Sequence, residues 1–425
     1  MKEYLRVFGV GFLVLVAGFV LAFQFVKPSP PKSITIATGS SSGAYFAYAQ
    51  QYKALLAEQG IELNIISTEG SIDNIQRLQA GDVDLAFVQS GTGQAYQQAN
   101  DIVALASIYY EPLWLFVPSD QVLFKTSDLL GKRIAVGTEG SGTRALAQVV
   151  LENNGVTANN ASFLDMNAER ATQALLNGDL DYLFLVSSVE SSLVQQLLLE
   201  TSLMPFDFER VKAYTRRYRF LSDTELPQGV IDFQRDIPAI DVNLLSAAAT
   251  VVAKEGVHPA LVALLMQIFD KVHGEGGILE APGQFPSEHY LDFPLDDSAQ
   301  RYFDYGPPLL QRYLPFWVAV LVNQLKVFLI PLIALMIPLV RVLPILYRWR
   351  IRSRIYRWYR DLREMEQEAN QQGLTPAHRA ALLSRLQRMH NRLMEESIPL
   401  SYHDELYHLR LHIELVRDNL HQDNY

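Results

Sequence analysis

Hydrophobic and polar positions divide the chain into segments of three kinds. Residues 7–26 form an apolar run without charge, and its length matches the roughly 30 Å core of a bilayer at 1.5 Å of rise per residue. Residues 315–346 form a second apolar segment, interrupted by prolines. Short apolar runs alternate with helical patterns between them, and a polar helical stretch follows. We expect two membrane spans around a folded α/β region.

Flanking charges give these spans a direction. Lys2 and Arg6 precede the first run, and residues 348–360 interleave arginines with Trp and Tyr after the second. The positive-inside rule therefore predicts that both termini are cytoplasmic and that the region between the spans is periplasmic, in a bacterial inner membrane. We expect an anchor over 1–27, a second transmembrane segment within 315–346, crossing from about 316 to 340, and anionic lipid as a partner of the arginine-rich flank.

One alternative for the first run is a cleaved signal peptide. No small-x-small cleavage site precedes Pro28, so an uncleaved anchor is favoured. Residues 28–31, Pro-Ser-Pro-Pro, then read as a stiff linker.

Alternating β-like and helical patterns over residues 33–185 indicate an α/β fold with mainly parallel strands. Each apolar run is followed by a turn rich in Gly or Ser and then by a helical period. The expected strands are 33–38, 61–67, 85–88, 103–108, 113–117, 133–136 and 182–185, and helices are expected at 45–58, 71–80, 144–153 and 169–177.

One pattern occurs twice. A strand, a Gly/Ser turn and a helix are followed by Gly-Asp-x-Asp before an apolar strand, at 81–84 and again at 178–181. We interpret the repeat as two similar lobes, lobe I from 28–117 and 230–314 and lobe II from 118–229. Ligands of open α/β sheets bind beyond the carboxyl ends of the strands, so the two lobes are expected to enclose a cleft.

Four Gly/Ser turns precede helices or follow strands, at 40–43, 68–71, 89–92 and 137–144. Helix N-termini present backbone N–H groups and the positive end of the helix dipole, which suits a carboxylate or phosphate. A serine there can equally be only a helix cap. Arg144 can bind an anion or form a salt bridge within its lobe, and Tyr45, Asn74 and Gln89 can contact a ligand or belong to the core.

The segment after the second span, residues 347–425, is expected to be a cytoplasmic helical tail. Thr375-Pro376 is typical of a helix start. Heptad-like spacing then predicts a short seam, which can serve a dimer or a hairpin that packs on itself. The seam residues are Leu406, Leu409, Ile413, Val416 and Leu420.

The composition of the chain excludes several classes of partner and of functional site. The 425 residues have a formal net charge of −10 and no cysteine, which argues against nucleic acid as a partner and excludes disulfides and thiolate metal sites. No P-loop, Rossmann fingerprint, HExxH or EF-hand pattern is present. We therefore expect no cofactor and no metal.

Three stretches carry a resemblance to a known family. "ITIATGSSSGAYF", "ISTEGSIDNIQRLQAGDVDLAFVQSG" and "RIAVGTEGSGTRALAQVVLENNGV" resemble TAXI-family solute-binding proteins of TRAP transporters, over about residues 33–275. The resemblance implies a two-lobed, class II periplasmic-binding-protein-like fold that binds small organic acids, including glutamate, for TRAP-type permease subunits. The ligand-binding positions that it implies are Ser41, Ser42, Tyr45, Ser71, Asn74, Gln89, Ser90, Ser141, Thr143 and Arg144.

Two departures from that family stand out. Gly91 occupies a position where the family usually has an acidic residue, and the apolar segment with its arginine-rich flank resembles a membrane-tethered branch. The favoured function is a tethered receptor for a small anionic solute, a carboxylate or an amino acid.

Two other functions stay open. One is a transmembrane sensor or scaffold that signals through the tail, which can also mediate self-association. The other is a serine hydrolase at Ser41, because residues 39–43 match G-x-S-x-G. That motif lacks an earlier strand and loop to complete an oxyanion hole, so we expect no enzyme.

Overall fold

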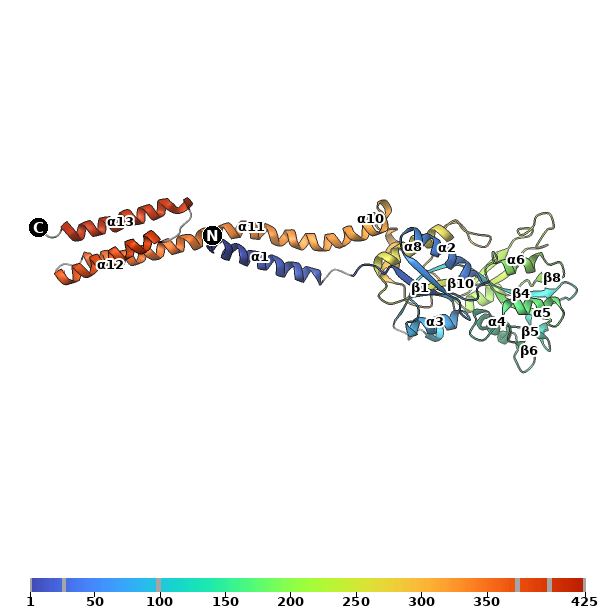
Figure 1. Cartoon of the computed structure of the whole chain (residues 1–425). Helices are drawn as coiled ribbons and strands as arrows, with labels where there is room; N and C mark the ends of the chain where they lie inside the picture. Colours follow the sequence, from blue (N-terminus) through green and yellow to red (C-terminus); the bar gives the residue numbers. More distant parts are fainter. Residues whose placement is uncertain (1, 25–27, 97–100, 371–374, 396–399, 423–425) are drawn as a thin grey trace. The chain divides into compact units, whose positions relative to one another are not determined.

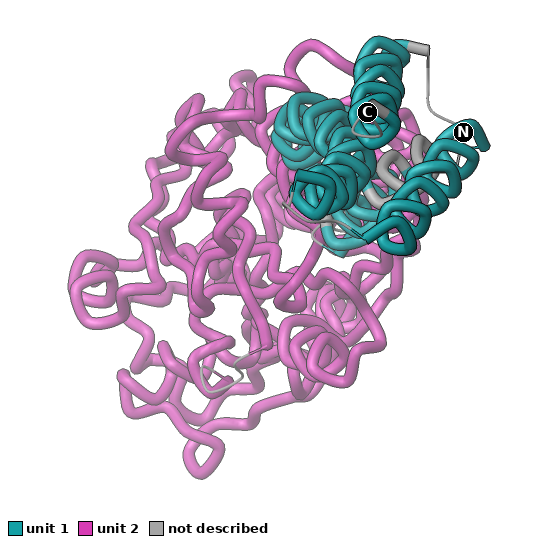
Figure 2. The backbone as a smooth tube through the Cα atoms, turned by 90° about the vertical axis from the view of Figure 1, so that its left-hand side faces the viewer, with its two compact units in different colours: residues 1–27, 322–425 teal, residues 28–321 magenta. Residues whose placement is uncertain are grey.

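The computed structural model describes residues 2–24, 28–96, 101–370, 375–395 and 400–422. The chain forms two compact units, one of residues 28–321 and one of residues 1–27 with 322–425 (Figure 2). We call the first the receptor unit and the second the helical unit. The last residues of the expected N-terminal anchor, 25–27, lie outside the described residues.

One mixed sheet organises the described part of the receptor unit (Figure 1). Its strand order is β2-β1-β3-β10-β4-β7-β5-β6, with β8 paired to β4 and β9 to β10. The strands are β1 Ser33–Ala37, β2 Glu62–Ile66, β3 Leu85–Gln89, β4 Ile102–Pro118, β5 Arg133–Ala135, β6 Ser162–Leu164, β7 Tyr182–Val186, β8 Leu203–Pro205, β9 Ser222–Leu226 and β10 Val242–Lys254.

The expectation of parallel strands holds at the two ends of the sheet. Strands β1, β2 and β3 pair in parallel, and so do β5, β6 and β7. Between these groups, β4 and β10 run antiparallel along each other and connect them. The two strands expected at 103–108 and 113–117 are one continuous strand, β4, which reaches into both halves. We call the half around β1–β3 the first half and the half around β5–β7 the second half.

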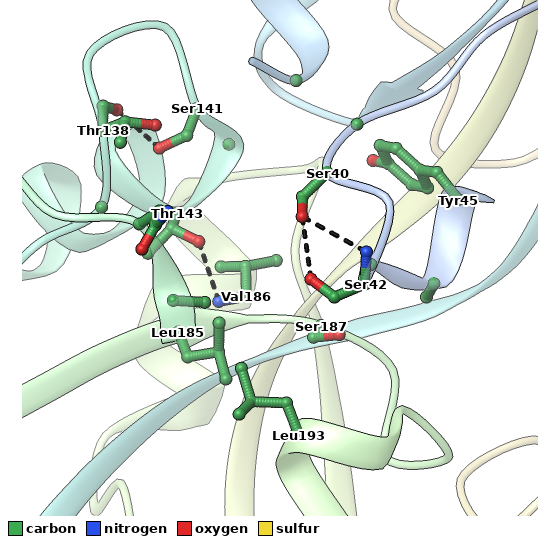
Figure 3. A pocket seen from close by; sticks show the side chains of 18 of the residues that line it. Ser40, Ser42, Tyr45, Thr138, Ser141, Thr143, Leu185, Val186, Ser187 and Leu193 are labelled. Carbon is green, nitrogen blue, oxygen red and sulfur yellow. Dashed lines mark hydrogen bonds between the residues drawn. The ribbon is translucent and has the colours of Figure 1, made fainter. Parts of the chain in front are cut away.

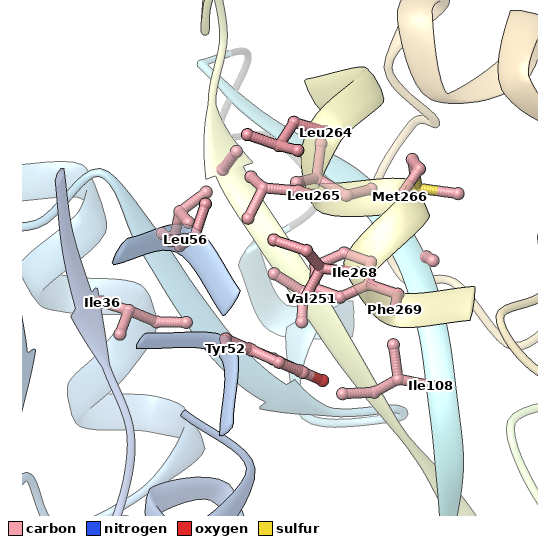
Figure 4. Packing of buried hydrophobic residues seen from close by; sticks show 14 of the residues in the cluster. Ile36, Tyr52, Leu56, Ile108, Val251, Leu264, Leu265, Met266, Ile268 and Phe269 are labelled. Carbon is pink, nitrogen blue, oxygen red and sulfur yellow. The ribbon is translucent and has the colours of Figure 1, made fainter. Parts of the chain in front are cut away.

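Helices cover both faces of each half. They are α2 Ala44–Glu58, α3 Ser71–Ala80, α4 Gly142–Asn153, α5 Ala168–Leu176, α6 Ser192–Leu199, α7 Val211–Arg217, α8 Pro259–His273, α9 Asp297–Tyr305 and α10 Leu309–Tyr313. In the core of the first half, Tyr52 and Leu56 of α2 and Phe269 of α8 pack around β1 and β10 (Figure 4). Burying each such large apolar side chain contributes about 1.5–3 kcal/mol.

The receptor core extends to the start of helix α11, Phe316–Ala369. Phe316 and Val320 are buried in the same cluster as α2 and α8. The indole N–H of Trp317 donates to the carbonyl oxygen of Gln59 over 2.7 Å. The first turns of this apolar helix therefore belong to the receptor unit.

In the helical unit, α1, Lys2–Phe23, packs along α11. The rings of Phe19 and Phe328 are stacked with centroids 5.1 Å apart. A Cβ placed on Gly18 would lie 2.6 Å from Leu335 Cδ2, so glycine permits this close approach. Of the described helices, α11 is long and apolar enough to cross a membrane, while the described apolar part of α1 is the shorter Gly11–Leu21.

The tail forms its own small core from the end of α11, α12, Pro376–Glu395, and α13, His403–Gln422. The five residues of the expected seam are all buried in this core, against Leu362, Leu386 and their neighbours. The seam is thus used within one chain, as in the hairpin interpretation.

Candidate functional site

A cavity of about 180 Å³ lies between the two halves of the receptor unit. Ser40, Ser42 and Tyr45 lie on one side, and Ser141 and Thr143 on the other (Figure 3). The floor is formed by β4 and β7, through Glu111 and the apolar residues around Leu185. The cavity therefore draws on both halves of the fold.

Helix N-termini converge on this cavity. Residues at the first turns of α2, α3, α4, α5 and α6 all line it. Ser141 caps α4 by accepting from the backbone N–H of Arg144, Asn167 caps α5 and Ser191 caps α6. Each terminus carries backbone N–H groups without an intrahelical acceptor and roughly half a positive charge from the dipole. The cavity is thus suited to an anionic group.

Glycines allow the two halves to meet at the cavity. Gly70, which precedes α3, has a φ of 124°, a backbone conformation that other residues rarely adopt. At Gly142 a Cβ would overlap Gln89 Oε1. This close approach lets the Gln89 amide donate to the carbonyl oxygen of Gly142 over 3.2 Å, across the two halves.

Three further contacts join the halves. The backbone N–H of Ile72 donates to the carbonyl oxygen of Gly140 over 3.4 Å. The Ser42 hydroxyl donates to the Glu169 carboxylate, and the Tyr48 hydroxyl donates to Glu190 over 2.9 Å. The structure thus has the two halves in contact around the cavity, which corresponds to a closed arrangement.

Glu111 is the buried charged residue of the cavity floor. It is 4% exposed and accepts the Tyr45 hydroxyl over 2.7 Å and the Tyr109 hydroxyl over 3.2 Å. Burial raises the pKa of Glu111 from 4.5 to about 7, although both tyrosine hydrogen bonds lower it. Tyr45 in turn stacks on Phe87 with ring centroids 4.8 Å apart. This carboxyl is therefore held rigidly and can exchange a proton near neutral pH.

The ten residues expected to bind ligand are placed in two groups. Four of them lie outside the cavity lining: Ser41 is exposed, Asn74 and Ser90 are buried, and Arg144 pairs with Asp165 at 3.3 Å. The Asn74 amide donates to the carbonyl oxygens of Thr38 and Phe87, which fixes the turn. The six that line the cavity are Ser42, Tyr45, Ser71, Gln89, Ser141 and Thr143. Their role in binding stays a prediction.

The sequence interpretation missed the carboxylates. Glu69, Glu111 and Glu169 line the cavity, together with Asn167 and Ser191. No lysine, arginine or histidine is among the described residues that line it. Glu111 could have been found from its pattern, because a single carboxylate inside the apolar run of β4 has to be buried, and buried acids cluster at functional sites.

Ser41, the serine of the G-x-S-x-G match, lies outside the lining, and His273 bonds Tyr52 over 2.6 Å within the core. Among the described residues, the cavity lining therefore contains no serine–histidine pair of the kind that a hydrolase of this type needs. Among the described residues, no group of three or more His, Cys, Asp or Glu side chains is placed to hold a metal ion.

Comparison with known proteins identifies the receptor unit. The model of the NMT1-like family matches residues 36–304. Its fold is periplasmic-binding-protein-like, and this family of substrate-binding proteins agrees with the expectation that the chain is not an enzyme.

Solved structures that match part of this chain include several solute-binding proteins. The alkanesulfonate-binding protein of Xanthomonas axonopodis pv. citri, bound to MOPS, is 17% identical over 58% of this chain and 75% of its own, with a TM-score of 0.41. The aliphatic sulphonate-binding protein of Escherichia coli is 12% identical over 58% and 70%, with a TM-score of 0.40. An arginine-bound substrate-binding protein of Streptococcus pneumoniae is 15% identical over 57% and 89%, with a TM-score of 0.37.

Proposed function

The chain belongs to the NMT1-like family, and we propose that it is a membrane-tethered receptor that captures a small carboxylate-bearing solute for a separate transporter. The solute is an organic acid or an amino acid. The observation that carries this proposal is the convergence of five helix N-termini on one cavity. Backbone N–H groups at such termini bind carboxylates without requiring a basic side chain.

The hydroxyls around these termini support the same assignment. Ser42, Ser71, Ser141 and Thr143 line the cavity beside α2, α3 and α4. The Thr143 hydroxyl accepts the backbone N–H of Val186 over 3.0 Å, so its own proton can be donated to a ligand oxygen. The carboxylate of the solute would lie between these first turns.

Capture requires the halves to open and close. The contacts from Ser42 to Glu169 and from Tyr48 to Glu190 hold the closed arrangement. A solute that contacts both halves shifts the equilibrium towards this arrangement, and a membrane partner can recognise it. A TRAP-type permease is the partner that the resemblance of the sequence favours.

We propose that α1 and α11 form the tether, with the outer boundary of the membrane later along α11 than the expected start at residue 316. Phe316 and Val320 are buried in the receptor core, and buried side chains cannot face lipid. The stacked rings of Phe19 and Phe328 instead pair the apolar part of α1 with α11 beyond this point. The span of α11 would then run from about Phe328 to Leu346, after Lys326 and before Arg348, with Arg341 in its second half.

Solute binding is tested by thermal unfolding of the full chain in detergent, against a panel of small carboxylates and amino acids. A solute at 100 times its dissociation constant stabilises the folded state by about 2.7 kcal/mol. Ser141→Ala should weaken the shift, while the exposed Ser162→Ala, on β6, should leave it unchanged. If no carboxylate and no amino acid gives a shift, the receptor proposal fails, and the sensor or scaffold gains support.

A further inference from the structure

The charges around the cavity do not match a purely anionic solute. Three carboxylates line it, from Glu69 before α3, Glu111 on β4 and Glu169 in α5. The described lining contains no basic side chain that would balance them. A dicarboxylate could place one group at the helix N-termini, but its second group would lie in a cavity whose charged side chains, among the described lining, are all carboxylates.

Of the three carboxylates, Glu111 can interact most strongly with a charged group of the ligand. It lies on the cavity floor, 4% exposed, so little water screens it. The groups that act on it are the hydroxyls of Tyr45 and Tyr109, and both are neutral. Tyr109 stacks on His273, whose pKa burial lowers to about 3, so this histidine brings no positive charge to the cluster.

The buried Glu111 carboxyl thus has tyrosine hydroxyls as its partners, and the described lining offers it no cationic side chain. Burial raises the pKa of Glu111 to about 7, which shows how unfavourable its charge is in this place. A cation bound against it would remove that penalty, because an opposite charge within about 4–6 Å stabilises the ionised carboxylate. The Tyr45 and Tyr109 hydrogen bonds fix both oxygens and hence the direction of approach.

We propose that the solute carries a cationic nitrogen that binds the Glu111 carboxylate on the cavity floor, in addition to the anionic group held at the helix N-termini. The inference rests on the proposed receptor function and chooses among its solutes: acids that carry an amine bind tightly, and organic acids without a basic nitrogen bind more weakly. Glu169, which already accepts the Ser42 hydroxyl between the halves, lies in the lining as a second acceptor for such a nitrogen.

Matched solutes test the proposal on the unmodified full chain. Three sets are compared by calorimetry at pH 8: alanine with lactate and ethylamine, leucine with 2-hydroxyisocaproate and isopentylamine, and glutamate with 2-hydroxyglutarate and 4-aminobutanoate. In the set that binds best, the hydroxy acid should bind at least about tenfold more weakly than the amino acid, which corresponds to about 1.4 kcal/mol. Equal binding of the hydroxy acid overturns the inference and leaves the receptor function intact.

Single substitutions test whether the cationic nitrogen of the solute binds Glu111. Glu111→Gln should weaken the amino acid by about tenfold or more and leave the hydroxy acid unchanged. The exposed Glu152→Gln of α4 is the matched control, because it removes a carboxylate outside the lining. If the amino acid binds Glu111→Gln as tightly as the unmodified chain, Glu111 is not its partner. Failure of all nine solutes to bind would count against both the inference and the receptor function.

Discussion

The hydroxyl of Tyr45 donates to the carboxylate of Glu111 over 2.7 Å, which joins the first turn of α2 to the longest strand of the sheet. This hydrogen bond lies at the cavity, within the core of the first half. It therefore connects the stability of the fold with the chemistry of the site.

Tyr45→Phe should destabilise the receptor unit by about 1–3 kcal/mol, because it leaves a buried carboxyl with one donor fewer. The same change raises the pKa of Glu111 further, since the Tyr45 hydrogen bond lowers it. Chemical denaturation with urea measures the loss. Tyr305→Phe is the control, because that ring is 82% exposed, and it should change stability by less than about 0.5 kcal/mol.

Glu111 should make stability depend on pH in an identifiable window. Its pKa is raised from 4.5 to about 7, so between these values the unfolded chain has lost the proton and the folded chain still holds it. Stability therefore falls as pH rises from 4.5 to 7, by roughly 3 kcal/mol, and the contribution is constant above pH 7.

The comparison that isolates this effect is the difference in unfolding free energy between the unmodified chain and Glu111→Gln. That difference should decrease from pH 4.5 to pH 7. Asp292, whose pKa burial raises to about 6, contributes the same sign in both proteins and cancels in the difference. A difference that does not change with pH would show that Glu111 titrates normally.

Tyr48→Phe should weaken solute binding severalfold and have little effect on folding. The lost hydroxyl donates to Glu190 on the other half, so the change affects the closed arrangement alone. The dissociation constant and small-angle scattering with saturating solute check this. Tyr218→Phe removes a hydroxyl that bonds Asn153 within the second half, and it should leave both measurements unchanged.

Arg144→Ala should leave the dissociation constant within about threefold of its original value, since Arg144 pairs with Asp165 outside the cavity lining. Thr143→Val, one position earlier, should bind more weakly because Thr143 lines the cavity. Titration calorimetry with the same solute measures the dissociation constants of both variants. If Arg144→Ala loses as much binding as Thr143→Val, Arg144 contacts the solute and the prediction is wrong.

The membrane boundary can be mapped with single cysteines, because the chain has none of its own. A membrane-impermeant maleimide added outside intact spheroplasts should label Val318→Cys and leave Ile333→Cys unlabelled. Both positions are partly exposed, at 42% and 48%, so burial in the protein does not explain a difference. Arg352→Cys should react only after the membrane is permeabilised. Labelling of Ile333→Cys from outside would contradict the proposed span.

Patterns in the sequence were sufficient to predict the helices and strands near the cavity. Ser71–Ala80 was expected with the bounds that α3 has, and β1, β3, β5 and β7 lie within a residue of their expected ranges. Turns with Gly and Ser between a strand and a helix carry enough local information for this, since their glycines and caps determine where each helix starts.

The sequence did not predict how strands far apart along the chain pair in the sheet. Strand β10, Val242–Lys254, was not expected, because its alanine-rich apolar run favours a helix by propensity. Its conformation is determined by its position between β3 and β4, where both faces are buried and period-two alternation disappears. The pairing of Arg144 with Asp165 likewise depends on tertiary contacts.

Because Phe316 and Trp317 are packed into the receptor core, helix α11 begins within the receptor unit. If that helix crosses the bilayer as proposed, the receptor meets its transporter by lateral diffusion in a surface instead of by a search through the whole periplasmic volume. Confinement of this kind raises the effective concentration of one partner for the other without a new contact. Each cell could then serve its transporters with few copies of the receptor.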